Sequence, residues 1–175
     1  MINRISKHEK WYWWIIIGIE LVLFYSSSMT YKQQTSVPFL EKHLGSNNKP
    51  FYSLLNQISF DYGGKIQSIK NDGYYHFVEF FIRKGAHFGI YFLLGLFLSL
   101  ALYNYFKSYK FLSVFVPWMM ATGLAAFDEF HQGLTGGRTP SVSDVILDSA
   151  GALLASAILL LIIYILNSKR KKDLK

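Results

Sequence analysis

The sequence contains no cysteine among its 175 residues, so disulfide bonds and thiol catalysis are excluded and no redox compartment can be inferred. It also lacks the nucleophile elbow of serine hydrolases and the glycine-rich phosphate loop of nucleotide-binding enzymes. Acidic residues are few, since 11 Asp and Glu stand against 18 Lys and Arg, for a net charge of +7. No familiar motif therefore names a nucleophile, and we expect no cofactor.

The basic excess is densest in residues 169–172, which directly follow an apolar segment. Such a run is typical of a cytoplasmic membrane flank facing anionic lipid headgroups. A nucleic-acid-binding protein would instead carry a basic face interleaved with stacking aromatics on a soluble element. We therefore expect membrane lipids, and not nucleic acid, as partners.

The apolar residues make up 51% of the chain and gather in long uninterrupted runs. A membrane-spanning helix needs about 20 such residues. The runs predict an all-α integral membrane bundle, a single domain over residues 1–175 with about four transmembrane helices. The expected spans are 11–28, 86–106, 111–128 and 142–166, and an extracytoplasmic loop covers about 30–80, with a short amphipathic helix over 51–58.

The first run begins after basic residues, as a secretory signal does. Its aromatic start over residues 11–14 and the lack of a small-residue cleavage site favour a retained helix. Four spans place both termini on one side, and the basic ends with Lys107 and Lys110 predict that this side is the cytoplasm. Arg83 and Lys84, on the opposite side, make the charge rule imperfect here.

In this topology the second span begins, the third ends and the fourth begins at one outer membrane face. The ionisable and amide side chains in or beside the spans lie at those same ends: Arg83, Lys84 and His87; Asp128, Glu129 and Gln132; Arg138; Asp144 and Asp148. A charge at the bilayer centre costs about 2.5–3.5 kcal/mol on insertion scales. We therefore expect these side chains to face one another, water or a ligand.

Helical spacing supports a shared site. Arg83 and His87 lie four residues apart on one face, as do Asp144 and Asp148. The latter face continues as Gly151, Ala152 and Ala155, small residues that let helices approach closely. We expect the fourth span to face the bundle along that line.

Three segments, RKGAHFGIY, DEFHQGLTGGR and SDVILDSAGALLA, together with the upstream FYSSSMTYKQQ, resemble the VanZ-like family in order and spacing. The resemblance implies a bacterial cell-membrane protein, and relatives are implicated in low-level resistance to teicoplanin, a glycopeptide that binds cell-wall precursors outside the membrane. It implies no reaction, because the family's mechanism is not established. The matching positions are Arg83, Lys84, His87, Asp128, Glu129, Gln132, Gly137, Arg138, Asp144, Asp148 and Gly151.

Local alternatives stand beside the site hypothesis. Asp144 lies three residues after Ser141, the spacing of a helix capping box. Lys84 is favoured as a residue that reaches to the membrane surface. Arg83 is favoured as a carboxylate or anion contact because its planar fork suits bidentate binding. Glu20, inside the first span, has no partner that the sequence reveals.

Three classes of function remain open. The cluster is compatible with an outward-facing site for an anionic or amphiphilic envelope molecule, such as a lipid-linked cell-wall precursor or a glycopeptide, with or without catalysis. It is also compatible with a small transporter or flippase component, and with a structural lock that fixes helix register. The spacing matches no standard metal motif, and the sequence does not fix the oligomeric state. In the first class the acid–base candidates are His87, Asp128, Glu129 and Asp148, and the ligand-binding candidates are Arg83, Lys84, Gln132, Arg138 and Asp144.

Overall fold

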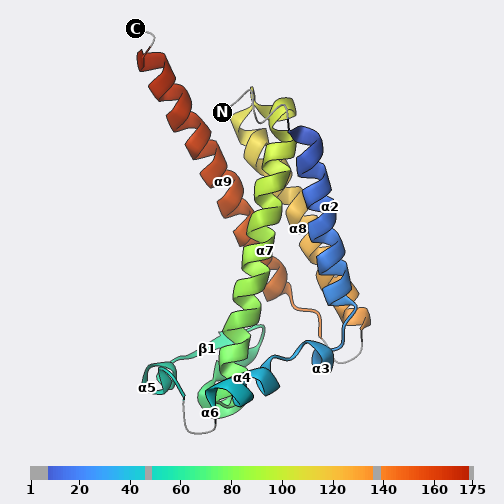
Figure 1. Cartoon of the computed structure of the whole chain (residues 1–175), viewed down its shortest axis with the longest axis vertical. Helices are drawn as coiled ribbons and strands as arrows, with labels where there is room; N and C mark the ends of the chain where they lie inside the picture. Colours follow the sequence, from blue (N-terminus) through green and yellow to red (C-terminus); the bar gives the residue numbers. More distant parts are fainter. Residues whose placement is uncertain (1–7, 46–48, 136–138, 174–175) are drawn as a thin grey trace.

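The computed structural model describes residues 8–45, 49–135 and 139–173, with side chains up to residue 169. Four long helices form a bundle, and a small segment of short helices and a hairpin covers one end (Figure 1). The elements in chain order are α2 (Glu9–Ser27), α3 (Tyr31–Gln34), α4 (Val37–Leu44), α5 (Tyr52–Leu55), β1 (Ser59–Tyr62), β2 (Lys65–Ser68), α6 (Ile69–Asp72), α7 (Tyr74–Phe106), α8 (Lys110–Leu134) and α9 (Val142–Asp173).

The helices α7, α8 and α9 are each long and apolar enough to cross a membrane. α2 reaches that standard only together with α3 and α4, from which it is bent by 119°. The described part of the chain therefore holds three or four candidate spans, as the apolar runs predict. Large apolar side chains such as Leu21, Leu161 and Ile162 are exposed on these helices, which suits contact with lipid. The protein is a multi-pass membrane protein.

α7 begins twelve residues earlier than the predicted start at residue 86. Its 33 residues correspond to about 50 Å of helix, well beyond a bilayer core of about 30 Å. The extra turns carry Tyr74 and Phe77, which are buried in a second small core with Ile69 and the neighbouring loops. Burial against the loop segment, and not the bilayer, thus explains why the helix starts early.

The main core lies where α7 and α9 cross. Gly95 of α7 faces Ala152 of α9 so closely that an added Cβ would lie 2.6 Å from the Ala152 Cα. On the other side of the contact, a Cβ on Gly151 would lie 2.6 Å from the Phe88 carbonyl oxygen. Ala152 and Ala155 are fully buried. The predicted small-residue face of the fourth span is therefore confirmed as the line along which it packs on the bundle.

The segment between the first two long helices contains a hairpin that the sequence analysis did not predict. β1 and β2 pair antiparallel, with Tyr62 opposite Lys65, around a two-residue turn of Gly63 and Gly64. Both glycines have positive φ, as a tight hairpin turn requires. The amphipathic helix expected over 51–58 is reduced to the single turn α5, and Leu54, expected on its buried face, is exposed.

The two ends of the bundle differ in what they carry. At the end we call the tail end, α2 begins, α7 turns into α8, and α9 ends (Figure 1). The Glu9 carboxylate there accepts hydrogen bonds from Asn104 Nδ2 and the Tyr105 hydroxyl, at 3.0 and 3.1 Å. The hairpin lies at the opposite end, which we call the hairpin end, where α7 and α9 begin and α8 finishes.

Candidate functional site

The predicted site residues gather at the hairpin end, where three helix ends meet. Lys84 of α7 and Asp144 of α9 form an ion pair, with Nζ to Oδ1 at 2.5 Å. The Tyr62 hydroxyl of the hairpin donates to the same carboxylate oxygen at 2.5 Å. Both charged side chains are largely buried, at 24% and 20% exposure. One carboxylate thereby ties together α7, α9 and the loop segment.

These contacts bear on the alternative interpretations of Lys84 and Asp144. Lys84 is not a lone cation, because its ammonium is paired with Asp144. The capping box at the start of α9 is wrong, because the Ser141 backbone N–H donates to Glu129 Oε1 at 2.7 Å and the Asp144 carboxylate is engaged elsewhere. Glu129, from the end of α8, therefore holds the start of α9. Its charge interacts electrostatically with Asp144 and Lys84, so the two contacts belong to one cluster.

One turn deeper, His87 of α7 lies against Asp148 of α9, with Nδ1 to Oδ2 at 3.3 Å. Asp148 is 3% exposed, and its other oxygen has no hydrogen-bond partner among the described residues. The Tyr91 hydroxyl, one turn further along α7, is also buried without a partner in the described part of the chain. Buried polar atoms normally have partners. This part of the cluster therefore has unused hydrogen-bonding capacity that water or a ligand group can take up.

On α8, both carboxylate oxygens of Asp128 accept hydrogen bonds from neighbouring side chains. Gln132 donates to Asp128 Oδ2 at 2.8 Å, one turn away. The other Asp128 oxygen accepts from the hydroxyl of Ser27 at the end of α2. Glu20, on α2, interacts electrostatically with Asp128, and its Oε1 is buried without a described partner. α2 is thereby joined to the cluster, and Asp128 is the neighbour of Glu20 that the sequence analysis did not identify.

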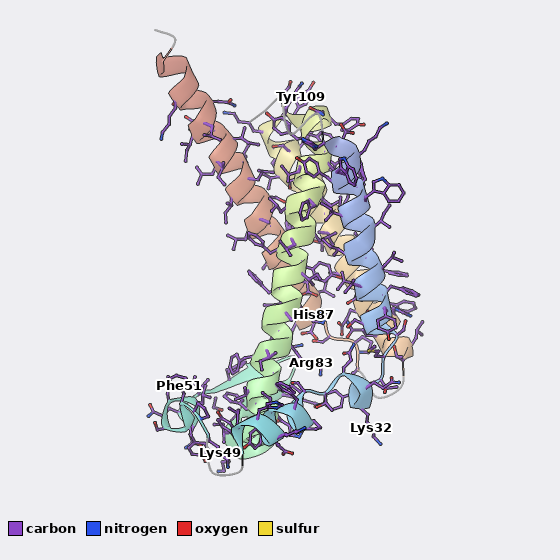
Figure 2. All side chains as sticks on the ribbon, in the orientation of Figure 1. Lys32, Lys49, Phe51, Arg83, His87 and Tyr109 are labelled. Carbon is purple, nitrogen blue, oxygen red and sulfur yellow. The ribbon has the colours of Figure 1, made fainter. Side chains whose placement is uncertain are left out.

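Arg83 stands apart from these pairs. Within the described residues, no carboxylate lies at ion-pair distance from it, and its guanidinium lies over the Tyr31 ring at 5.3 Å. Figure 2 shows Arg83 and His87 in successive turns on the lower part of α7. The predicted carboxylate contact of Arg83 is thus not made. An anionic ligand remains as the partner expected from the sequence.

Arg83 lines a cavity of about 390 Å³ between α7, the hairpin and α3, which we call the hairpin-side cavity. Lys65 and Lys84 supply two further cations to its wall, and Asp72 and Glu79 supply the acids. Both acids are engaged by backbone or neighbouring groups. Asp72 accepts from the Ser68 N–H at 2.9 Å, and Glu79 is held by the linker after α2. These neutral donors occupy the acceptor oxygens of the two carboxylates but leave their negative charge in place. What the cavity offers an anion is therefore the free donor groups of the Arg83 guanidinium rather than an excess of positive charge.

Glu79 is the best-satisfied carboxylate at this end. It accepts from the Tyr31 hydroxyl at 2.9 Å, from the Thr35 hydroxyl at 2.8 Å, and from the Ser36 N–H and hydroxyl at 2.5 and 3.2 Å. Four donors neutralise much of its acceptor capacity. The carboxylate holds the linker in place and leaves Arg83 one turn away without a partner.

Several of these residues were not expected as site residues. Tyr62 and Lys65 flank the Gly63-Gly64 turn, a pair of residues that is itself a hairpin signal. Burial, together with the hydrogen bond to Asp144, raises the pKa of the Tyr62 hydroxyl far above its ordinary value. Tyr62 therefore remains a donor at every physiological pH. Tyr31 and Ser27 lie in the FYSSSMTYKQQ segment, whose pattern alone gave them no role.

Two of the predicted positions are not placed by the structure. Arg138 and Gly137 lie outside the described residues, so the structure does not test the prediction that Arg138 binds the ligand. His131, next to the α8 carboxylates, stacks on Phe24 with ring centroids 4.5 Å apart. Among the described residues, no group of three or more His, Asp or Glu side chains is arranged to hold a metal ion.

The fold and the cluster define a small multi-pass membrane protein whose main helices close around ionisable groups at one end of the bundle. Residues 12–164 match the model of the VanZ/LLP1 family, and the chain belongs to that family. No curated protein and no solved structure was found to match the chain.

Proposed function

We propose that this protein binds an anionic or amphiphilic molecule of the cell envelope at the hairpin end, and that this binding lowers susceptibility to teicoplanin-type glycopeptides. The observation that carries the proposal is the unpaired guanidinium of Arg83 in the wall of the hairpin-side cavity. A partly desolvated Arg without a carboxylate is a favoured partner for phosphate or carboxylate. The link to glycopeptides rests on the VanZ-like resemblance alone.

The cavity suits a charged headgroup more than a wholly apolar ligand. Its volume of about 390 Å³ is at the lower end of small-molecule sites. Lys65 and Arg83 are the cations in its wall without a described carboxylate partner, whereas Lys84 is bound to Asp144. Phe80 and the Tyr31 ring add apolar surface. A phosphate with an attached apolar chain fits this mixture.

The His87–Asp148 pair supplies the acid–base candidate for any reaction. Four residues separate Arg83 from His87, which corresponds to about 6 Å along the helix. An anion held by Arg83 would therefore have its neighbouring bonds within reach of the His87 ring. Asp128 and Glu129 lie behind this pair and are themselves engaged, so they are better suited to fixing the charge balance than to proton transfer.

The orientation we propose puts the hairpin end outside and both termini in the cytoplasm. Its support is the distribution of lysines at the tail end, where Lys10, Lys107, Lys110 and Lys169 are found at the start of α2, the α7–α8 turn and the end of α9. Cytoplasmic ends of membrane helices carry an excess of such residues. The hairpin-side cavity then opens toward the cell wall.

The direct test is binding of a polyprenyl phosphate to the protein in nanodiscs, with the uncharged polyprenol as reference. Arg83→Gln removes the free cation and keeps a polar, hydrogen-bonding but shorter side chain. We expect it to weaken polyprenyl phosphate binding about tenfold or more, because hydrogen bonds to charged groups contribute about 1.5–3 kcal/mol. Polyprenol binding is expected to stay unchanged. Lys42→Gln, which removes an exposed cation of α4 outside the cavity, is the matched control.

Equal binding of phosphate and alcohol by the native protein, or an equal loss in the Arg83 and Lys42 variants, would contradict the proposal. Asp148→Asn separates a ligand site from a purely structural lock, which the closed Lys84–Asp144 pair favours as a second candidate function for the cluster. A folded Asp148→Asn protein that no longer lowers teicoplanin susceptibility supports the site. An unfolded one supports the lock.

A further inference from the structure

A second cavity lies at the tail end of the bundle, where α9 leans away from α7 and α8 (Figure 1). This tail-side cavity measures about 100 Å³ and is lined by the end of α7, the start of α8 and the last turns of α9. At its depth, the hydroxyls of Ser99 and Ser156 are hydrogen-bonded to each other at 2.8 Å. The volume suits a small polar group and is too small for a whole drug-sized ligand.

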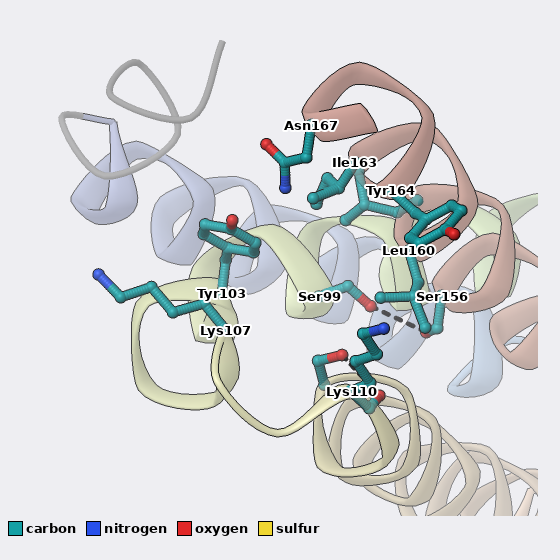
Figure 3. Close-up of a pocket in the computed structure, with 11 residues that line it drawn as sticks. Ser99, Tyr103, Lys107, Lys110, Ser156, Leu160, Ile163, Tyr164 and Asn167 are labelled. Atoms are coloured by element: carbon teal, nitrogen blue, oxygen red, sulfur yellow. Dashed lines mark hydrogen bonds between the residues drawn. The ribbon is translucent and has the colours of Figure 1, made fainter. Parts of the chain in front are cut away.

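The described charged residues that line the tail-side cavity are both lysines. Lys107 and Lys110 line it, and none of its described lining residues is acidic. The carboxylate of Glu9 is at the same end but accepts from Asn104 and Tyr105 instead. In Figure 3 the Lys110 side chain enters from α8, opposite Leu160 and Tyr164 of α9. Lys107 extends away from the opening there, and as an exposed side chain it can turn toward an anion at the mouth.

An apolar groove continues from the tail-side cavity toward the middle of the bilayer. It measures about 340 Å³, lies between α8 and α9, and shares Lys110 and Leu160 with the cavity. Its other lining residues are apolar or aromatic and include Val114, Trp118 and Leu153. Trp118 lies eight residues after Lys110, about 12 Å deeper along the helix. The polar cavity and the apolar groove are thus adjacent, with Lys110 and Leu160 where they meet.

We propose that this site binds one anionic phospholipid of the surrounding leaflet, with the phosphate at Lys107 and Lys110 and an acyl chain along the groove. Lysine binds phosphate as a point charge at the membrane surface while its stem covers apolar surface. The two cations without a facing acid select a negative headgroup. The groove selects a molecule with a chain over inorganic phosphate. This site is separate from the hairpin-side cavity and does not depend on its function.

Trp118 provides a built-in reporter. Its indole is fixed by a hydrogen bond from Nε1 to Ser149 Oγ at 2.8 Å, so it stays in the groove wall. Replacing the other three tryptophans, Trp11, Trp13 and Trp14, by Phe leaves a single fluorophore. The protein is then reconstituted in vesicles that contain dibrominated phosphatidylglycerol or dibrominated phosphatidylcholine, whose chains quench a tryptophan that they contact.

At equal mole fraction we expect brominated phosphatidylglycerol to quench Trp118 more strongly, with a preference of fivefold or more. Each Lys near an anionic headgroup is worth about a fivefold difference. Lys107→Gln combined with Lys110→Gln is expected to remove the preference. Lys169→Gln, a cation on the same end of α9 but outside the cavity, is the matched control and is expected to keep it. Val114→Phe, which fills the groove, is expected to reduce quenching by both lipids.

Equal quenching by the two lipids would overturn the selection of an anionic headgroup. An equal loss of preference in the Lys169 variant would overturn the site in favour of general attraction to an anionic surface. Displacement of brominated phosphatidylglycerol by millimolar inorganic phosphate would overturn the role of the groove. Weak quenching by both lipids that increases when the protein is diluted in lipid would show that a second copy of the chain covers the groove, and would overturn it as well.

Discussion

The close contact between α7 and α9 at Gly95 offers a sharp test of the packing of the bundle. Gly95→Ala adds one methyl group to α7 at a point where the new Cβ would lie 2.6 Å from both the Cα and the carbonyl oxygen of Ala152. Nonbonded carbon atoms normally stay about 3.5–4.0 Å apart. Because the facing atoms belong to the α9 backbone, no side chain can turn away. The two helices must separate by about 1 Å.

That separation has a cost that the structure allows us to estimate. Overpacking of a tight contact costs about 1–3 kcal/mol. The hydrogen bond between Ser99 and Ser156, one turn along, would lengthen from 2.8 Å to about 3.8 Å, beyond hydrogen-bonding distance. An interhelical hydrogen bond in a membrane contributes about 0.6 kcal/mol on average. We therefore expect Gly95→Ala to lower the free energy of unfolding by about 2–3 kcal/mol.

Equilibrium unfolding in mixed detergent micelles measures this change. Gly89→Ala is the matched control, because it makes the same substitution in the same helix at a site with nothing within 4 Å of the new Cβ. It is expected to be neutral or to stabilise by up to about 1 kcal/mol. Ser99→Ala is expected to cost less in the Gly95→Ala background than alone, since the bond is already broken. Equal stability of the two alanine variants would refute the close packing of α7 and α9.

Two further predictions concern the topology and the cluster. A cysteine that replaces Thr139, which is exposed at the hairpin end, is expected to react with an impermeant maleimide on intact cells. A cysteine that replaces Ser108, in the exposed α7–α8 turn, is expected to react only after permeabilisation. Labelling of both cysteines on intact cells would contradict the proposed orientation. Lys84→Met is expected to cost about 1–2 kcal/mol of unfolding free energy, because the Asp144 pair is half-buried, and Lys84→Met with Asp144→Asn is expected to cost less than the sum of the single changes. Additive costs would show that the pair contributes nothing.

The spans and the meeting of the helix ends were predictable because both follow from periodicity. An apolar run of sufficient length predicts a helix in lipid, and residues three or four apart share a face whatever surrounds them. Gly151 and Ala155 illustrate this, since their spacing predicted the face that packs on the bundle. His87 and Asp148 are another example, because each shares a helix face with a second candidate residue, Arg83 or Asp144, and the structure brings the two side chains into contact.

The partners within the cluster were less predictable. Several carboxylates at the same end were possible partners for Lys84. The structure shows that Lys84 and Tyr62 share Asp144, and the position of Tyr62 depends on the hairpin. Glu129 was expected as a chemical group and instead holds the start of α9 through the Ser141 amide. These outcomes depend on loop paths, which no helical period specifies.

The hairpin has a sequence signal of its own, which a search for long apolar runs does not detect. The stretch from Ser59 to Ser68 places Gly63-Gly64 between two short runs that include Phe60, Tyr62 and Ile66, a pattern typical of a tight antiparallel turn. Its four-residue strands are too short to stand out beside spans of more than twenty residues. Glu79 was missed for a related reason, because all its donors come from the irregular linker after α2.

Tyr31 connects the hairpin-side cavity to the segment that follows α2. The same side chain donates its hydroxyl proton to Glu79 and presents its ring to Arg83, the next residue along that face of α7. α2 contributes no described lining residue to the cavity, yet the chain that leaves α2 at Ser27 reaches this tyrosine four residues later. A headgroup at the Arg83 guanidinium would compete with this ring, and would therefore act on a side chain that also anchors the segment just after α2.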